Sequence, residues 1–385
     1  MSILLFILAL LLFSGLILAH EWGHFIFARR NGVKVEEFAL FFGPALYRHK
    51  TKAGWTFRIN LFPLGGYVKL FGEHDTDTEK GSFGAASLWA KTKIMGAGVV
   101  INIILGAILL MITAWVGMPQ LVPNQYTVKS DTKVVRSEVI LSYIEPGSPA
   151  AKAGLRAEDN VTAIGAAQIK SPDALKAATK RYGGQKVTIN YERQGKERST
   201  QATLLTKAAV DASLKTNNPK GQLGVIPTAY TLQRSTWSAP VVAVGLTGQF
   251  TVLTFQGLGH ALAGVGSIIA GGVTGNSTAR TNGQTTASGQ VSGTVGIVVI
   301  LKDGSLLGYQ FILFVMAVIS LTLGIMNLLP IPALDGGRLW LTLFMRGILK
   351  RPISPRREEL INAGGILFLL ALFALITVVD IKRFF

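Results

Sequence analysis

The stretch of sequence that decides the fold is ILLFILALLLFSGLILAHEWGH, residues 3–24. Its first part, residues 3–19, is apolar apart from one serine and one glycine. That length approaches the roughly 20 residues that a helix needs to cross the hydrocarbon core of a bilayer. No positively charged segment precedes it, and His20 and Glu21 follow where a signal peptide has its small-residue cleavage site. The stretch therefore predicts an uncleaved first transmembrane helix over residues 1–30.

The composition of the whole chain also indicates a membrane protein. Of its 385 residues, 49% are hydrophobic and only 15% are charged, against about 25% charged in a soluble domain. The net charge is +17, and the basic residues gather beside apolar segments, which is typical of positive-inside topology and contact with anionic lipid. Because no basic stripe carries interleaved aromatic residues, we predict membrane lipids and not nucleic acid as partners, with no obligatory partner chain.

Three later apolar segments predict further transmembrane helices. They lie at residues 94–117, in the first part of residues 310–349, and at residues 361–380. Each is long enough to cross a bilayer. Residues 235–280 are uncharged as far as Ala279, but their large apolar residues fall on one helical face. An interfacial amphipathic helix is therefore favoured there over a further span.

Two other segments have the alternating pattern of β-strands. Residues 31–93 are rich in lysine and arginine and contain a glycine pair at Gly65 and Gly66, which predicts a small β-hairpin region on the cytosolic side. Residues 130–207 are charged and predict an inserted extracytoplasmic α+β domain, with strand-like pieces at Val139–Ile144, Val161–Ile164, Val187–Tyr191 and Ala202–Leu205. The predicted fold class is a multi-pass α-helical membrane protein with four transmembrane helices and these two additions.

The pentapeptide HEWGH at the end of the first span predicts a metal site. His20 and His24 are four residues apart, so on a helix both imidazoles lie on one face and can bind one ion. Glu21 lies beside them and can act as general base on a water at that ion. Such polar groups at the end of a membrane helix are costly unless they are used. The alternative is that they end the span in the headgroup region without a metal.

Asp335 is the candidate for the third protein ligand that zinc requires beside two histidines and a water. It lies in NLLPIPALDGG, residues 327–337, after the third span. The two prolines break the helix and the two glycines permit close backbone approach. Irregular backbone at membrane depth is tolerated where it lines a protein or aqueous site. A helix N-cap is the alternative role for Asp335, and it is compatible with metal binding.

The number of spans tests this pairing of distant residues. One span separates the first from the third, so the two run the same way and HEWGH and Asp335 emerge on the same side. A further span at residues 235–280 would put them on opposite sides. The basic segments 29–94 and 338–360 fall on that same side, as positive-inside topology requires of the cytosol.

Together with HEWGH, the segments INLFPLGGYVKLFGE at 59–73 and NLLPIPALDGG at 327–337 resemble the site-2 protease family of intramembrane zinc metalloproteases. The closest similarity is to its bacterial RseP-like branch, here with one PDZ domain, indicated by GSPAAKAGL at 147–155. The resemblance implies one Zn²⁺ per chain bound by His20, His24 and Asp335, Glu21 as the catalytic carboxylate, and substrate near Asn327. It also implies a bacterial inner membrane, with single-span proteins or remnant signal peptides as substrates of regulated intramembrane proteolysis.

A helical substrate must be unwound before its carbonyls can be attacked. The strand-like segment 55–71, with Gly65 and Gly66 as predicted substrate-binding residues, offers an edge to which an unwound peptide can add as a strand. The alternative is a purely structural hairpin. Three other classes compete with a protease: a catalytically inactive membrane PDZ scaffold, a zinc or solute transporter, and a membrane-anchored soluble-type zinc enzyme. The transporter would place polar residues at mid-span in several helices.

Overall fold

The computed structural model describes residues 2–213, 220–278, 281–282, 294–304 and 307–384. The chain divides into two compact units. The first combines Met1–Thr113 with Ala239–Phe385, and the second is the inserted segment Ala114–Ser238.

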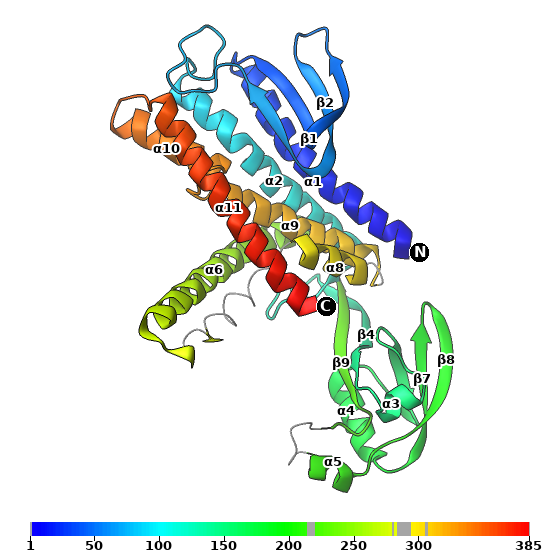
Figure 1. The fold of residues 1–385 in the computed structure, drawn as a ribbon. Coiled ribbons are helices and arrows are strands. Elements are labelled where there is room, and N and C mark those ends of the chain that lie inside the picture. The colour runs from blue at the N-terminus through cyan, green and yellow to red at the C-terminus, as the bar shows by residue number, and fades with distance from the viewer. Residues whose placement is uncertain (1, 214–219, 279–280, 283–293, 305–306, 385) are drawn as a thin grey trace. The chain divides into compact units, whose positions relative to one another are not determined.

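The first unit consists of helices and one two-stranded sheet (Figure 1). In chain order its elements are α1 (Ser2–Arg30), β1 (Val35–Lys50), β2 (Thr56–Leu70), α2 (Leu88–Val116), α6 (Ala239–Thr274), α8 (Thr294–Gly304), α9 (Tyr309–Leu328), α10 (Asp335–Thr342), the π-helical turn η1 (Leu343–Ile348) and α11 (Pro355–Phe384).

Four helices in the described part of the chain, α1, α2, α6 and α9, are long and apolar enough to cross a membrane. Three of them coincide with the spans predicted within residues 1–30, 94–117 and 310–349. The fourth, α6, covers residues 239–274 of the segment 235–280, whose last two residues lie outside the described residues. Figure 1 shows α6 running across the direction that α1, α2 and α9 share. Its interfacial placement stays a prediction.

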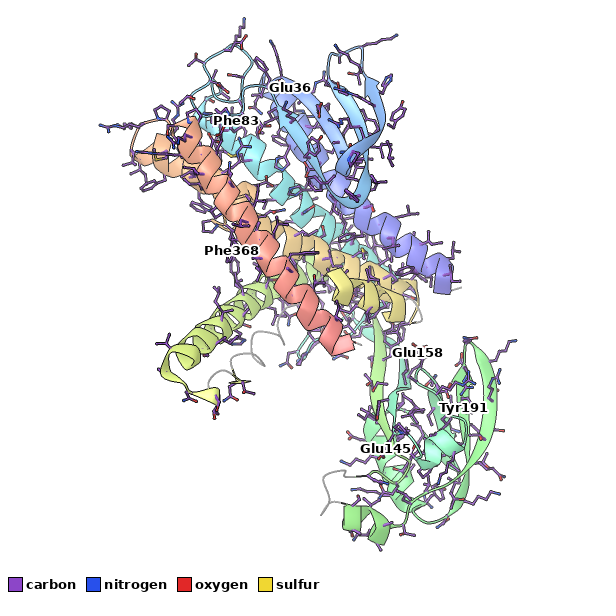
Figure 2. All side chains as sticks on the ribbon, in the orientation of Figure 1. Glu36, Phe83, Glu145, Glu158, Tyr191 and Phe368 are labelled. Atoms are coloured by element: carbon purple, nitrogen blue, oxygen red, sulfur yellow. The ribbon has the colours of Figure 1, made fainter. Side chains whose placement is uncertain are left out.

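The span predicted at residues 361–380 lies within helix α11. Large apolar side chains there face outward, since Leu367 is 70% exposed and Phe368 is 59% exposed (Figure 2). Exposed apolar side chains on a long helix are what contact with lipid requires. The crossing of the membrane by α11 stays a prediction.

Small residues let α2 and α9 approach closely, as they do between membrane helices in general. A Cβ atom added at Gly106 of α2 would lie 2.6 Å from the side chain of Leu321 on α9. The hydroxyl of Ser320 on α9 donates a 2.8 Å hydrogen bond to the backbone carbonyl of Asn102 on α2. Because both helices contribute to this contact, the middle of α9 is held against the middle of α2.

Strands β1 and β2 are long, antiparallel and irregular. Phe38 of β1 pairs with both Val68 and Phe57 of β2, so β2 passes β1 twice. The chain reverses between these two passes, near the predicted glycine turn, where Gly65 has a φ of +72°. The reversal returns residues 66–70 to the side of α1. Phe38 is 1% exposed and its ring packs against Phe25 of α1 at a centroid distance of 5.6 Å.

The second unit is built on a seven-stranded sheet in the order β3-β9-β4-β5-β7-β8, with β6 paired to β5. Its strands and helices are β3 (Met118–Pro119), β4 (Lys133–Ile144), α3 (Pro149–Lys152), β5 (Asn160–Ile164), β6 (Ala167–Gln168), α4 (Pro172–Arg181), β7 (Lys186–Arg193), β8 (Lys196–Thr203), α5 (Lys207–Ser213) and β9 (Val225–Arg234).

The four predicted strand-like pieces of this unit overlap β4, β5, β7 and β8. The sheet also contains β9, which lies beyond the predicted boundary at residue 207 and pairs along the length of β4. The core combines buried side chains from the sheet and from α4, among them Ile189, Leu175 and Tyr191, the last labelled in Figure 2. The assignment of this unit as a PDZ domain stays a prediction.

Candidate active site

The two histidines of HEWGH lie on one face of α1, as their spacing predicts. Nε2 of His20 and Nε2 of His24 are 3.2 Å apart. The His20 side chain is 10% exposed and that of His24 is 12% exposed. Since both rings turn the same nitrogen toward one point, they form one half of a common site.

Asp335 completes this cluster from the other end of the chain. Its Oδ2 lies 3.0 Å from Nε2 of His20 and 3.1 Å from Nε2 of His24. Asp335 is the first residue of α10, while Leu334 occupies the N-cap position without a side-chain hydrogen bond. The carboxylate of Asp335 therefore faces the imidazoles and does not serve as the N-cap.

The three ligand atoms have the spacing that zinc needs. A tetrahedral centre with bonds of about 2.0–2.1 Å separates its ligand atoms by about 3.3 Å. The observed separations are 3.0, 3.1 and 3.2 Å. These three residues also form the one group of metal-binding side chains found among the described residues. Two imidazoles and a carboxylate are donors that zinc accepts, so the residues fit the ion.

The charge of Asp335 is set by its neighbours. Burial acts to raise the pKa of Asp335, but imidazoles of His24 and His20 that carry protons on Nε2 outweigh burial and hold this pKa well below the usual range of a carboxyl group. A metal ion that takes the place of these protons supplies positive charge at the same point. Asp335 is therefore ionised near neutral pH, which is the state in which a carboxylate binds a metal.

A group on α2 contacts Nδ1 of each imidazole, the ring nitrogen that does not face the candidate metal site. Nδ1 of His24 donates a 2.8 Å hydrogen bond to the backbone carbonyl of Ile94, which leaves its Nε2 free as a ligand atom. Nδ1 of His20 lies 3.2 Å from the side-chain amide of Asn102, which is 1% exposed. Partners of this kind fix the tautomer and orientation of metal-binding histidines.

The side-chain amide of Asn102 can accept a hydrogen bond from His20 in only one of its two orientations. Its Nδ2 faces the His20 ring, while its Oδ1 is buried without a hydrogen-bond partner among the described residues. If His20 binds a metal through Nε2, its Nδ1 carries a proton and needs an acceptor. Rotating the amide by 180° presents Oδ1 to that proton, and the two ends of an amide are assigned from such networks. Asn102 then acts as the acceptor that orients His20.

The close approach of α2 to the site depends on Gly98. A Cβ atom at this position would lie 2.5 Å from Cε1 of His20 and 2.5 Å from Nε2 of His24. Real Cβ atoms do not approach other atoms so closely. The missing side chain of Gly98 thus leaves room for both imidazoles.

The segment before Asp335 is tightly folded. A Cβ atom at Gly336 would lie 2.3 Å from the carbonyl oxygen of Leu329, and one at Gly337 would lie 2.2 Å from that of Ile331. Ala333 has a φ of +75°, a left-handed conformation that costs a non-glycine residue about 1–2 kcal/mol. The two glycines therefore allow the turn that aims Asp335 at α1, as the sequence predicts.

All the predicted site residues line one cavity of about 500 Å³ in the first unit. Besides the three candidate ligands, it is lined by the candidate base and the predicted substrate-binding residues, namely Glu21, Asn327, Gly65 and Gly66. Glu21 lies beside the sheet, since a Cβ atom at Gly66 would lie 3.1 Å from its Cγ. Glu21 also accepts a hydrogen bond from the backbone N–H of Val68. The catalytic roles of these residues stay predictions.

Sequence reasoning did not assign three groups to the site. They are Asn102, Gly98 and the backbone carbonyl of Ile94. Asn102 gave a signal, because it is the one strongly polar side chain in the apolar part of its span. Polar side chains at membrane depth are expensive and tend to be functional. Neither Ile94 nor Gly98 carries a comparable signal, because their roles come from the packing of α2 against α1.

Comparison with known proteins adds an independent line of evidence. The model of peptidase family M50 matches residues 8–372. The chain is 26% identical to "Zinc metalloprotease RasP" of Shouchella clausii, over 97% of this chain and 98% of the relative. It is also 26% identical to "Probable protease eep" of Enterococcus faecalis, over 98% of each chain. The similarity therefore covers the membrane helices, the inserted unit and the site together.

Proposed function

The chain belongs to peptidase family M50, the site-2 protease family, and on that premise we propose that it cuts single-span membrane proteins or signal-peptide remnants within the bilayer. It is a membrane protein and a zinc metalloprotease. The observation that carries the proposal is the meeting of His20, His24 and Asp335 within 3.2 Å of one another, in a cavity that Glu21 also lines.

In this mechanism the side chains of His20, His24 and Asp335 hold the ion. A bound zinc ion supplies a Lewis acid and lowers the pKa of water towards about 7. Glu21 accepts a proton from the attacking water and later passes it to the leaving amine. Asn102 and the Ile94 carbonyl keep the imidazoles in the required tautomers. The cavity gives water and an unwound segment of substrate access to these groups.

The second pass of β2 supports a role in holding substrate as an added strand. Residues 66–70 pair with β1 on one side, and Gly66, Tyr67 and Val68 line the cavity on the other. An open strand edge offers backbone groups to an extended peptide. Such pairing would expose the scissile carbonyl that a helical substrate hides in its own hydrogen bonds.

Proline at position 68 tests this role, because it removes a backbone N–H on the cavity side of the strand. The same N–H donates to Glu21, so unchanged cleavage is the decisive outcome. We expect Val68→Pro to abolish cleavage of a single-span substrate and Val68→Ala, which keeps the N–H, to retain most of it. If Val68→Pro cleaves the substrate at the wild-type rate, the strand-addition model is wrong. The proposal of a metal site would not be affected by that result.

The orientation of the chain in the membrane is part of the same proposal. Loops on the side of the active site carry the excess of basic residues, which supports placing the site near the cytosolic face of a bacterial inner membrane. The inserted unit then lies on the extracytoplasmic side, where a PDZ-like domain either binds peptide or excludes bulky substrates.

The decisive experiment compares purified wild type with Glu21→Gln on a model single-span substrate, together with zinc analysis of both proteins. We expect cleavage by the wild type only, a loss of at least 100-fold in the variant, and about one zinc ion in each. Equal cleavage by both proteins would end the proposed mechanism. A wild type that binds zinc without cleaving any membrane substrate would favour the alternative of an inactive scaffold.

A further inference from the structure

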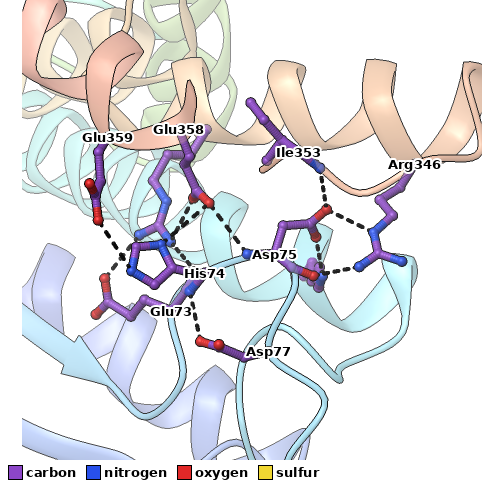
Figure 3. A network of polar contacts seen from close by, with 10 residues as sticks. Glu73, His74, Asp75, Asp77, Arg346, Ile353, Glu358 and Glu359 are labelled. Carbon is purple, nitrogen blue, oxygen red and sulfur yellow. Dashed lines mark hydrogen bonds and ion pairs between the residues drawn. The ribbon is translucent and has the colours of Figure 1, made fainter. Parts of the chain in front are cut away.

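A second polar cluster lies in the first unit outside the cavity, in the loop between β2 and α2 (Figure 3). Its centre is Asp75, which is 5% exposed. Its Oδ1 accepts a 2.5 Å hydrogen bond from Nζ of Lys91, and its Oδ2 accepts a 2.8 Å hydrogen bond from Nε of Arg346. Oδ2 also accepts a hydrogen bond of 3.2 Å from the backbone N–H of Ile353. One carboxylate thus joins three separate segments of the chain.

The two cations lie next to the candidate metal ligands in the fold, one on the helix that supports His24 and the other on the segment that follows Asp335. Lys91 is on α2, one helical turn before Ile94, whose carbonyl holds His24. Arg346 is in η1, which continues directly from α10, the helix that begins at Asp335. Asp75 therefore connects the turn of α2 that supports His24 with the segment that follows Asp335.

Neighbouring residues of the loop strengthen this connection. Nη2 of Arg338, three residues after Asp335, donates a 3.1 Å hydrogen bond to the backbone carbonyl of Glu73. The backbone N–H of Asp75 donates to the carboxylate of Glu358 at 3.3 Å. The ring of Phe83, labelled in Figure 2, has the charged groups of Lys91 and Arg338 over it at 5.5 and 5.3 Å. The loop is therefore fixed against α2, α10 and α11 together.

The buried charges of the cluster leave its side chains little freedom to rearrange. Lys91 is 2% exposed, so its ammonium depends on Asp75 for compensation. Burial acts to raise the pKa of Asp75, but hydrogen bonds from Lys91 and Arg346 outweigh it and hold the pKa below its usual value. Removing one partner from such a buried set leaves the other charge unpaired, and the surrounding segments must then move.

We propose that Asp75 is a positioning residue of the metal centre, which fixes the α10–η1 segment bearing Asp335 against the turn of α2 that holds His24. Asp75 lines no part of the cavity and contacts no ligand side chain. It acts through Lys91 and Arg346 by keeping the carboxylate of Asp335 at its 3 Å separations from the imidazoles. The inference rests on the proposed zinc site.

The test is the zinc affinity of full-length Asp75→Asn, purified in detergent and measured by competition with a chelator. The amide keeps the shape of the side chain but offers only one oxygen to two cations. We expect zinc to bind 10–100-fold more weakly than to the wild type, the range found when partners of metal ligands are removed. Glu79→Gln is the matched control, because Glu79 is an exposed carboxylate in the same loop, and its affinity should equal that of the wild type.

A purely structural role for Asp75 predicts a different result. The metal-free variant would then unfold at a lower temperature, while the folded protein would bind zinc with wild-type affinity, and that outcome overturns the inference. If Asp75→Asn does not fold, Arg346→Gln takes its place, because the Arg346 side chain is 35% exposed and its loss is tolerated more easily. Wild-type zinc affinity in folded Arg346→Gln would equally overturn it.

The same titration separates this inference from the proposed function. If the wild type itself binds no zinc, and His20→Ala behaves identically, the metal site fails. If the wild type binds zinc and His20→Ala does not, while Asp75→Asn and Arg346→Gln bind as tightly as the wild type, only the positioning role fails.

Discussion

Gly98 leaves the space that the imidazoles of both candidate ligands on α1 occupy. It is the point on α2 where the helix backbone passes both imidazoles, and a methyl group there would overlap His20 and His24. A change this small, 74 residues along the chain from the nearest candidate ligand, is therefore expected to act on metal binding.

We predict that Gly98→Ala lowers zinc affinity at least 10-fold and cleavage with it, because the imidazoles must turn away from the added Cβ atom. Gly96→Ala is the control, since a Cβ atom at position 96 meets nothing within 4 Å, and alanine favours the helix by about 0.5–1 kcal/mol. Zinc titration of both purified variants is the measurement. Equal affinities in the two variants would show that α2 adjusts without disturbing the site.

The candidate ligands could be predicted from the sequence because their signals are local. The spacing of His20 and His24 gives a shared helical face, and the prolines and glycines around Asp335 mark a broken helix. The carbonyl of Ile94 and the loop residue Asp75 could not be predicted in this way. Their roles depend on which turn of α2 packs against α1 and on where residues 343–348 meet the loop between β2 and α2. No short sequence pattern predicts either arrangement.

At the scale of elements, the polar loop between β2 and α2 controls how α10 is held. The ionised form of Asp75 is the one that accepts hydrogen bonds from Lys91 and Arg346. Its pKa in the folded chain lies below the value of about 3.9 expected when the chain is unfolded. Asp75 therefore contributes stability above that unfolded value and loses the contribution as the pH falls through its folded pKa.

We predict that Asp75→Asn lowers the free energy of unfolding by about 3–5 kcal/mol near pH 7, the cost of breaking a buried ion pair. The difference from the wild type should shrink below about pH 4. The charged groups that face Asp75 are Lys91, Arg346 and Glu358. Denaturant unfolding of both metal-free proteins at pH 7, 5 and 3.5 measures this. A difference that stays constant with pH would contradict the prediction.

Helix α6 presents a conflict between composition and topology. Its length and hydropathy permit a crossing of the membrane. However, His20 on α1 and Asp335 after α9 lie together, which in the proposed topology places the ends of α1 and α9 on the same side of the bilayer. With α2 between them, a single additional crossing by α6 would reverse α9. The geometry of the site therefore favours α6 at the interface, as the sequence predicts.

We predict that cysteines placed at Val241 and Val273, near the two ends of α6, are labelled by an impermeant thiol reagent from the same side of the membrane. Both side chains are exposed, and the chain contains no cysteine of its own to interfere. Inverted and right-side-out vesicles distinguish the sides. Labelling of the two positions from opposite sides would show that α6 crosses and that the chain returns by another route.

At the scale of the whole molecule, the sequence predicted spans and units better than it predicted sheet pairing. Apolar segments of bilayer length stand out in composition, which is why residues 1–30 and 94–117 correspond to α1 and α2. The pairing of β4 with β9 joins strands with some 80 residues between them, and the alternating pattern of β9 carries no information about its partner. The predicted segment 130–207 for that reason does not include β9.

We predict that the hairpin and the inserted unit are reached from opposite sides of the membrane. A cysteine at Lys52, an exposed position between β1 and β2, should react in inverted vesicles only, and one at Lys196, an exposed position in β8, in right-side-out vesicles only. The physical reason is the single crossing by α2 between them. Reaction of both in the same vesicles would contradict the topology and the cytosolic placement of the site.

The distance along the chain between His20 and Asp335, 315 positions, has a consequence for biosynthesis. At about 5–20 residues per second, a ribosome needs on the order of 15–60 s to reach the aspartate after the first helix has been made. During that interval the nascent polypeptide holds two imidazoles without their carboxylate partner. With the proposed ligand set, the new chain therefore cannot complete its zinc site during membrane insertion, and it becomes active only when translation is nearly over.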